Sequence, residues 1–454
     1  MKEFTEEYLN EIREIISRHD HDAAVRELAD MHPADIAELY QDLDLEEAEY
    51  LYNLLDEDTR ADVLMELDED DRRKLLNDMS AKEIAEQFIE HLDTDEAVDL
   101  IQELDEEERE EVLSHIDDVE QAGDIIDLLK YDEDTAGGLM GTEMIVVNEN
   151  WSMPECIKEM RAQAEEMDEI YYVYVVDDDE RLKGILPLKT LITHPSVQKI
   201  RNVMEEDPAS VKTDTPLDDV ALDFEKYDLV AMPVVDSIGR LVGRITVDDV
   251  MDRVRESQER DYQLASGISS DIDAADSVFA QTRARIPWLL IGIASGILAS
   301  LILSGFEGQL AVVPALALFI PIIGGTGGNV GVQASAIVVQ GLANGSLDIK
   351  MFASQLWKEV RVGLLNATVI SAIIFLYNLI TIPDNFAVTI AVATSLFIVV
   401  MFATMLGTVV PLTLEKLKIN PALATGPFIQ ISNDIVGLII YVSVAKAFLR
   451  IFGA

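Results

Sequence analysis

The chain divides into two parts that need different solvents. Residues 277–454 contain nine basic and six acidic residues, which leaves 25 basic and 79 acidic residues in residues 1–276, a net charge of -54 against -51 for the whole chain. After Pro287 the sequence is dominated by long apolar runs. We therefore predict a soluble acidic region followed by a region embedded in lipid. A strong negative charge argues against nucleic acid as a partner and favours cations.

Residues 1–130 are predicted to form an all-α, superhelical N domain of short helices. Leu-Asp pairs recur along it, and we expect each Leu to close one helix and each Asp to cap the next. Ser80 is expected to cap a further helix between two of these pairs. The pairs are Leu43-Asp44, Leu55-Asp56, Leu67-Asp68, Leu92-Asp93 and Leu104-Asp105.

Residues 131–255 contain an internal repeat. Val173–Ile192 aligns with Met232–Met251 at a constant offset, and each copy is predicted to form a strand, a turn, a second strand and a helix. This pattern is similar to a tandem pair of CBS domains, a regulatory α/β module, at residues 131–200 and 201–255. Residues 256–276 are polar and are predicted to form a linker helix.

The transmembrane domain, residues 277–454, contains five apolar segments, each long enough to cross a hydrocarbon core of about 30 Å. Basic residues flank the loops that we place inside, so the N-terminus is predicted to be cytoplasmic and the C-terminus outside. Lys446 and Arg450 run against this rule. The flanking residues are Arg283, Arg285, Lys350, Lys358, Arg361, Lys416 and Lys418. The segments are roughly Pro287–Leu303, Leu310–Leu342, Val362–Ile382, Ala387–Leu412 and Ala422–Leu449.

Two features in the apolar half indicate an ion path. Residues 324–333 hold five glycines, which we expect to break the second membrane segment. A break at that depth must face protein or water, so the Gly328 carbonyl and Asn329 are candidate ion ligands, although close helix packing through glycine is an alternative. Asp434 is expected to be the lone acid inside any span, which makes it a candidate functional residue. All six histidines and Cys156 lie in the acidic half, so the path offers only oxygen ligands, which suit Mg²⁺ or Ca²⁺.

At these residues the chain resembles the MgtE family of magnesium channels. Tyr131–Met140 is similar to the family's junction between N domain and CBS pair. Pro321–Gln333 is similar to its pore signature, and Asp434-x-x-Gly437 to its last-helix signature. The chain departs from the family pattern at Arg260, Gln340 and Asn433.

The resemblance implies a homodimer with one Asp434 from each subunit at the pore, and a linker helix that plugs it. It also implies regulatory Mg²⁺ sites on acids of the cytoplasmic region. Asp95/Asp99 and Asp248/Asp252 are each spaced i, i+4, which places two carboxylates on one helix face. ATP is a candidate ligand because CBS pairs often bind adenine nucleotides, but no phosphate-binding loop is evident. The regulatory residues are Asp95, Asp99, Asp228, Asp248, Asp249, Asp252 and Asp261.

We therefore expect a Mg²⁺-selective channel or transporter of the cell inner membrane, closed when Mg²⁺ binds its cytoplasmic acids. A secondary transporter of Co²⁺ or Mn²⁺ on the same scaffold is the main alternative. A membrane-embedded enzyme is disfavoured, because the spans lack a nucleophile–base pair and a histidine cluster. A further alternative is that the acidity is a halophilic adaptation and senses nothing.

Overall fold

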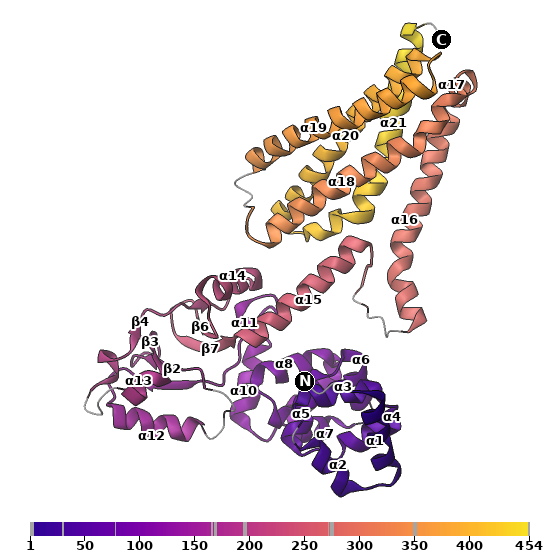
Figure 1. Cartoon of the computed structure of the whole chain (residues 1–454). Coiled ribbons are helices and arrows are strands. Elements are labelled where there is room, and N and C mark those ends of the chain that lie inside the picture. Colours follow the sequence, from indigo (N-terminus) through magenta and orange to yellow (C-terminus); the bar gives the residue numbers. More distant parts are fainter. Residues whose placement is uncertain are drawn as a thin grey trace. The chain divides into compact units, whose positions relative to one another are not determined.

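The computed structural model describes residues 4–29, 31–77, 79–164, 167, 170–193, 198–270, 272, 277–347 and 352–452 (Figure 1). The chain forms two compact units, Met1–Asp252 and Arg253–Ala454. Lys350, which contributed to the predicted orientation, and residues 271 and 273–276 of the predicted linker lie outside the described residues.

The first unit begins with a succession of short helices. Buried aliphatic side chains such as Leu39, Leu64 and Ile89 pack between them. The helices are α1 (Glu6–Ser17), α2 (His21–Leu28), α3 (Pro33–Asp42), α4 (Leu45–Tyr52), α5 (Glu57–Glu66), α6 (Glu69–Leu76), α7 (Ala81–Gln87), the 3₁₀ turn η1 (Ile89–His91), α8 (Thr94–Glu103), α9 (Glu106–His115) and α10 (Val119–Leu128).

The predicted helix starts are confirmed. Asp68 and Asp93 occupy the N-cap positions of α6 and α8 without accepting a capping hydrogen bond through their side chains. The other caps each accept a bond from a backbone N–H of the first turn, which satisfies donors that have no partner inside the helix. These are Asp44, Asp56, Ser80 and Asp105.

Two small sheets with flanking helices follow. The first sheet has the strand order β1-β2-β3-β4 and the second the order β5-β6-β7. Val173 pairs with Leu186 in the β2–β3 hairpin, and Met232 pairs with Ile245 in the β6–β7 hairpin, so the two copies of the repeat share one register. The elements are α11 (Ala136–Leu139), β1 (Ile145–Asn148), α12 (Met153–Gln163), β2 (Tyr172–Val176), β3 (Leu182–Pro187), α13 (Leu188–Thr193), η3 (Ile200–Asn202), β4 (Glu205–Glu206), β5 (Val211–Lys212), α14 (Leu217–Tyr227), β6 (Ala231–Val235), β7 (Leu241–Thr246) and α15 (Val247–Ser266).

The hairpin turns of the two copies are joined through their backbones. The Leu182 N–H donates to the Gly239 carbonyl at 3.2 Å, and the Leu241 N–H donates to the Glu180 carbonyl at 3.0 Å. Because Glu180 and Gly239 are equivalent positions of the repeat, these two hydrogen bonds relate the copies by local two-fold symmetry.

The second unit contains five helices that are long and apolar enough to cross a membrane. Of these five helices, α19 and α20 pack along each other, and α18 and α21 pack against α20 (Figure 1). The elements of this unit are α16 (Val278–Ser304), α17 (Glu307–Val312), η4 (Pro314–Phe319), α18 (Ile320–Ala343), α19 (Phe352–Thr381), α20 (Phe386–Lys416), η6 (Pro421–Ala424) and α21 (Gly426–Phe452).

The prediction that glycines break the second membrane segment is wrong. Helix α18 runs without interruption through residues 324–333. A continuous helix satisfies its own backbone hydrogen bonds, which lipid cannot do. The glycines instead admit neighbouring side chains: a Cβ at Gly327 would lie 2.7 Å from Val399 Cγ1 of α20. Close packing, the alternative considered from the sequence, is therefore part of their role.

Helix α19 extends beyond the predicted third segment and carries an acid near its start, outside the interior of the span to which the prediction for Asp434 refers. Helix α19 begins at Phe352 rather than near Val362, and its first turns include Glu359. Glu359 is 5% exposed, and Gln355 Nε2 donates to its carboxylate at 3.3 Å. The hydropathy pattern missed this helical start because the first turns of α19 carry polar residues such as Gln355 and Glu359.

Candidate metal centre and ion path

Three acids of the first unit converge on one point. One carboxylate oxygen each from Asp93, Asp95 and Glu143 lies within 4.8 Å of the others. Asp93 and Asp95 stand at the start of α8, and Glu143 lies in the segment between α11 and β1. Thr94 ties the two segments together, because its N–H and its hydroxyl donate to Glu143 at 3.0 and 3.1 Å.

Asp249 of α15 is the fourth acid of this cluster. Its carboxylate accepts hydrogen bonds from the N–H and the hydroxyl of Thr246, which hold it at the start of the helix. Arg244 also contacts the cluster: its guanidinium donates to the Glu143 carbonyl and lies 3.6 Å from Asp93. We define the acidic cluster as Asp93, Asp95, Glu143 and Asp249.

The electrostatics of the acidic cluster favour a cation. Burial, and then the charges of Asp249 and Glu143, raise the pKa of Asp95 well above its usual range. Burial also raises the pKa of Asp249, against the hydrogen bonds from Thr246, which lower it. The Oδ1 atom of Asp95 is buried and has no hydrogen-bond partner among the described residues. A divalent cation would supply the missing partner and reverse these pKa shifts.

Gly141 lets the Glu143 and Asp95 carboxylates approach because it has no Cβ. A Cβ there would lie 2.9 Å from a Glu143 carboxylate oxygen and 3.2 Å from Asp95 Oδ1. The donor set consists of oxygens only, which fits a hard cation such as Mg²⁺ and does not favour Zn²⁺ or Cu²⁺.

The other predicted regulatory acids lie in several settings. Asp99 lies one turn beyond Asp95 on α8, where its charge helps raise the pKa of Glu103 to about 7 after the larger effect of burial. Asp228 ends α14 in a left-handed conformation with φ 52°. Asp228, Asp248 and Asp252 are exposed.

Asp261 of α15 has a protein partner within the second unit. Asn420 Nδ2, in the segment between α20 and α21, donates to its carboxylate at 2.8 Å. Close by, a Cβ at Gly426 would overlap the Ala265 carbonyl oxygen at the end of α15. The end of α15 therefore lies against the start of α21.

Sequence reasoning missed Asp93 and Glu143 as members of the acidic cluster. Asp93 was assigned only as a helix cap. Glu143 lies far along the chain from α8, and the one signal that points to it is its place just after the segment resembling the N domain–CBS junction.

The candidate ion path lies where α21 faces α18. A Cβ at Gly324 would lie 3.3 Å from Asp434 Oδ1, and one at Gly328 would lie 3.9 Å from it. Gln430, one turn before Asp434, also contacts the Gly328 position, at 3.3 Å. Asp434 is half-buried and Asn329 is exposed. The glycine face of α18 therefore lets the Asp434 carboxylate lie against the backbone of α18.

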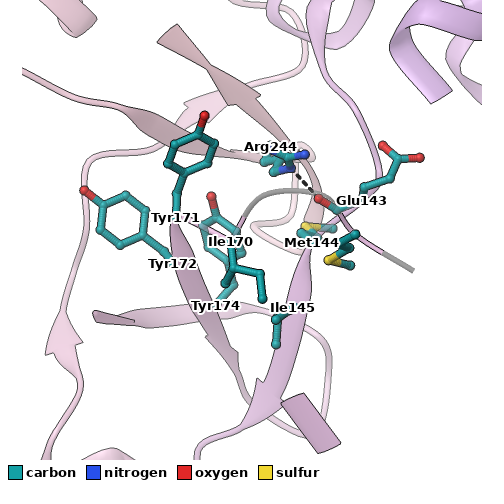
Figure 2. Close-up of a pocket in the computed structure, with 9 residues that line it drawn as sticks. Glu143, Met144, Ile145, Ile170, Tyr171, Tyr172, Tyr174 and Arg244 are labelled. Carbon is teal, nitrogen blue, oxygen red and sulfur yellow. Dashed lines mark hydrogen bonds between the residues drawn. The ribbon is translucent and has the colours of Figure 1, made fainter. Parts of the chain in front are cut away.

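A small cavity adjoins the acidic cluster on the side of β2. Figure 2 shows tyrosine side chains grouped around Arg244, with the Arg244–Glu143 hydrogen bond drawn. The buried Tyr174 hydroxyl has no hydrogen-bond partner among the described residues. The cavity volume is about 10 Å³, room for a single water molecule.

Comparisons with known proteins match three regions of the chain to known families. Residues 320–444 match a family described as divalent cation transporter, residues 31–134 match the MgtE intracellular N domain, and residues 136–196 and 200–256 each match the CBS domain. The chain is 37% identical over 330 residues to the magnesium transporter MgtE of Thermus thermophilus, covering 71% of this chain and 72% of that protein. It is 32% identical over 323 residues to the magnesium transporter MgtE of Bacillus subtilis, covering 71% of each.

Two solved structures resemble the cytosolic part. The crystal structure of the soluble part of a magnesium transporter is 31% identical with a TM-score of 0.51, covering 56% of this chain and 98% of that chain. The cytosolic domain of the Mg²⁺ channel MgtE in complex with ATP is 32% identical with a TM-score of 0.50, covering 54% and 99%.

The fold and these matches define a multi-pass membrane protein with an all-α N domain and a CBS pair ahead of its membrane helices, which confirms the predicted fold class. The chain belongs to the MgtE family.

Proposed function

We propose that the chain conducts Mg²⁺ across the membrane along the path beside Asp434, and that Mg²⁺ bound at the acidic cluster closes that path. The observation that carries the proposal is the position of the Asp434 carboxylate against the glycine face of Gly324 and Gly328 in a chain of this family. Mg²⁺ gives up its waters reluctantly, so a single carboxylate suits a cation that keeps its hydration shell.

Flux measurement tests the path. Asp434→Asn keeps the shape of the side chain and removes its charge, so Mg²⁺ uptake into proteoliposomes should fall to near background. Wild-type uptake by this variant would place the path elsewhere. Uptake of Co²⁺ or Mn²⁺ that exceeds uptake of Mg²⁺ in the wild type would favour the alternative cargo.

Regulation follows from the acidic cluster. Without a cation, its carboxylates repel one another, and a bound Mg²⁺ removes the repulsion and stabilises the arrangement in which they converge. Neutralising Asp249 and Asp252 together should leave the channel open at millimolar internal Mg²⁺. If this double variant closes with the wild-type Mg²⁺ dependence, neither Asp249 of the cluster nor the exposed Asp252 holds the regulatory Mg²⁺.

We propose the remaining arrangement on the same grounds. The domains divide at residues 130, 200, 255 and 276, the N-terminus is cytoplasmic and the C-terminus is outside. Asp434 is half-buried and Asn329 is exposed in one copy of the chain, which supports a homodimer that completes the path. Light-scattering mass of the detergent-solubilised protein tests the homodimer, and a monomeric, conducting protein would contradict it.

We also propose ATP as a ligand of the CBS pair, since a relative's cytosolic domain is described in complex with ATP. The cavity in Figure 2 has room for one water, so binding there requires the tyrosine side chains to move. Calorimetric titration of the full chain with ATP tests this, and no heat of binding at millimolar ATP would contradict it.

A further inference from the structure

Asn433, the residue before Asp434, has an unusual environment. It is 1% exposed, and neither its Oδ1 nor its Nδ2 has a hydrogen-bond partner among the described residues. Burying an amide without partners lowers stability relative to an apolar side chain of similar shape. Stability therefore does not explain why an asparagine stands at position 433.

The amide fits a specific gap in the facing helix. A Cβ at Gly331 of α18 would overlap Asn433 Nδ2 and would lie 2.7 Å from Ile429 Cγ2 of α21. The Asn433 side chain therefore occupies the space that a side chain at position 331 would take, and the pair sets how closely α18 and α21 approach.

Gly331 is also held from its other side. A Cβ at Gly407 of α20 would overlap the Gly331 carbonyl oxygen and would lie 3.1 Å from Ala334 Cβ. The α18 backbone at Gly331 is thus fixed between Asn433 and Gly407. We call these three residues the α18 clamp.

The α18 clamp acts close to the ion path. Gly324, Gly328 and Gly331 are spaced by four and three residues, so they share one face of α18. Gly324 and Gly328 face Asp434, whereas Gly331 faces Asn433. A shift of α18 at the clamp therefore changes the distance between the Asp434 carboxylate and the opposite helix wall.

We propose that Asn433 is a positioning residue that sets how closely α18 approaches the Asp434 carboxylate and thereby the discrimination between Mg²⁺ and larger divalent cations. The proposal rests on the proposed function of the Asp434 path. Mg²⁺ requires short, regular oxygen distances and holds its waters, whereas Ca²⁺ accepts longer distances and variable geometry. A small change in the distance between α18 and Asp434 should therefore affect the Mg²⁺ and Ca²⁺ fluxes unequally.

The test compares Mg²⁺ and Ca²⁺ uptake into proteoliposomes for Asn433→Ala and Asn433→Thr. Both variants shorten the side chain and loosen the clamp. We expect retained Mg²⁺ uptake and a severalfold fall in the Mg²⁺/Ca²⁺ flux ratio, with the larger fall in Asn433→Ala. A residue that only fills space would change yield or thermal stability and leave this ratio at its wild-type value.

A double-variant series tests the geometry. Gly331→Ala should lower Mg²⁺ uptake, and Asn433→Ala should restore it in part, because it removes the nearest clash and leaves Ile429 Cγ2 at 2.7 Å. Gly363→Ala is the matched control: its methyl group meets Thr404 in the contact between α19 and α20, so Asn433→Ala should not restore uptake there. If Gly331→Ala does not fold, the flux ratios of the two Asn433 single variants still decide the proposal.

Two results overturn the proposal: a wild-type flux ratio in both Asn433→Ala and Asn433→Thr, or equal rescue of Gly331→Ala and Gly363→Ala by Asn433→Ala. Failure of the proposed path is distinguishable, because it shows as wild-type uptake by Asp434→Asn, whatever the behaviour of Asn433.

Discussion

The sharpest consequence of the acidic cluster concerns Asp95→Asn. Two like charges 4.8 Å apart repel by about 3 kcal/mol at an effective dielectric constant of 20. Burial and the charges of Asp249 and Glu143 raise the pKa of Asp95, so folding disfavours the charged form of this carboxyl. Asp95→Asn removes one repelling pair, so the variant should be more stable than the wild type in EDTA, by up to about 3 kcal/mol, and the difference should grow as pH rises.

The response to Mg²⁺ should reverse this order. Mg²⁺ at 100 times its dissociation constant stabilises the wild type by about 2.7 kcal/mol, a rise in Tm of roughly 5–10 °C for a unit of this size. Asp95→Asn removes the buried ligand and should lose most of that rise. Circular dichroism of the full chain in detergent, with EDTA or MgCl₂ at matched ionic strength, measures both effects.

Glu110→Gln provides the matched control, because Glu110 is an exposed acid of α9 outside the acidic cluster. It should keep the whole Mg²⁺-dependent rise. The reasoning is refuted if Asp95→Asn also keeps it, or if KCl at equal ionic strength produces the same rise in the wild type, as a halophilic surface would.

Three further outcomes are expected. Burial raises the pKa of Glu96 to about 8 and that of Glu103 to about 7, both above their unfolded value of 4.5. The free energy of unfolding in EDTA should therefore fall as pH rises from about 4.5 to 8. Denaturant titrations measure this, and an unchanged free energy of unfolding across the range would contradict it. Asn378 is fully buried, and its amide has no hydrogen-bond partner among the described residues. Asn378→Leu should therefore stabilise the membrane domain by about 1–3 kcal/mol without changing Mg²⁺ flux. A lower Tm in this variant would show that the Asn378 amide has a hydrogen-bond partner. Gly327→Ala brings a methyl group to 2.7 Å from Val399 Cγ1 and should lower the Tm, and Val399→Ala should restore it; unrelieved loss would place the clash elsewhere.

Local features of the fold were predictable because local physics decides them. Asp44, Asp56 and Ser80 cap helices because their short side chains reach the first-turn N–H groups whatever the tertiary context. The constant offset between the copies of the repeat likewise predicted two hairpins, and their registers agree at Val173 and Met232.

Long-range features were not predictable in the same way. Glu143 joins the acidic cluster through a loop, and neither charge nor periodicity marks it among so many acids. The glycines of α18 have a low intrinsic propensity for helix, which predicted a break. In lipid, however, the backbone N–H and C=O groups have no hydrogen-bond partner except one another, so the helix continues through the glycines. Glu359 shows the same limit, since a hydropathy pattern marks the apolar core of a span and not the ends of its helix.

The backbone hydrogen bonds between the two hairpin turns bear on how the duplicated copies diverge. Bonds between Leu182 and Gly239 and between Leu241 and Glu180 use main-chain atoms, so they make no demand on side-chain identity. Natural selection can therefore alter one copy without uncoupling it from the other. The second copy holds Arg244, Thr246 and Asp249, where the first holds Ile185, Pro187 and Thr190. The duplicated copies have thus become chemically different, with charged groups at two of these positions, Arg244 and Asp249, in the second copy alone.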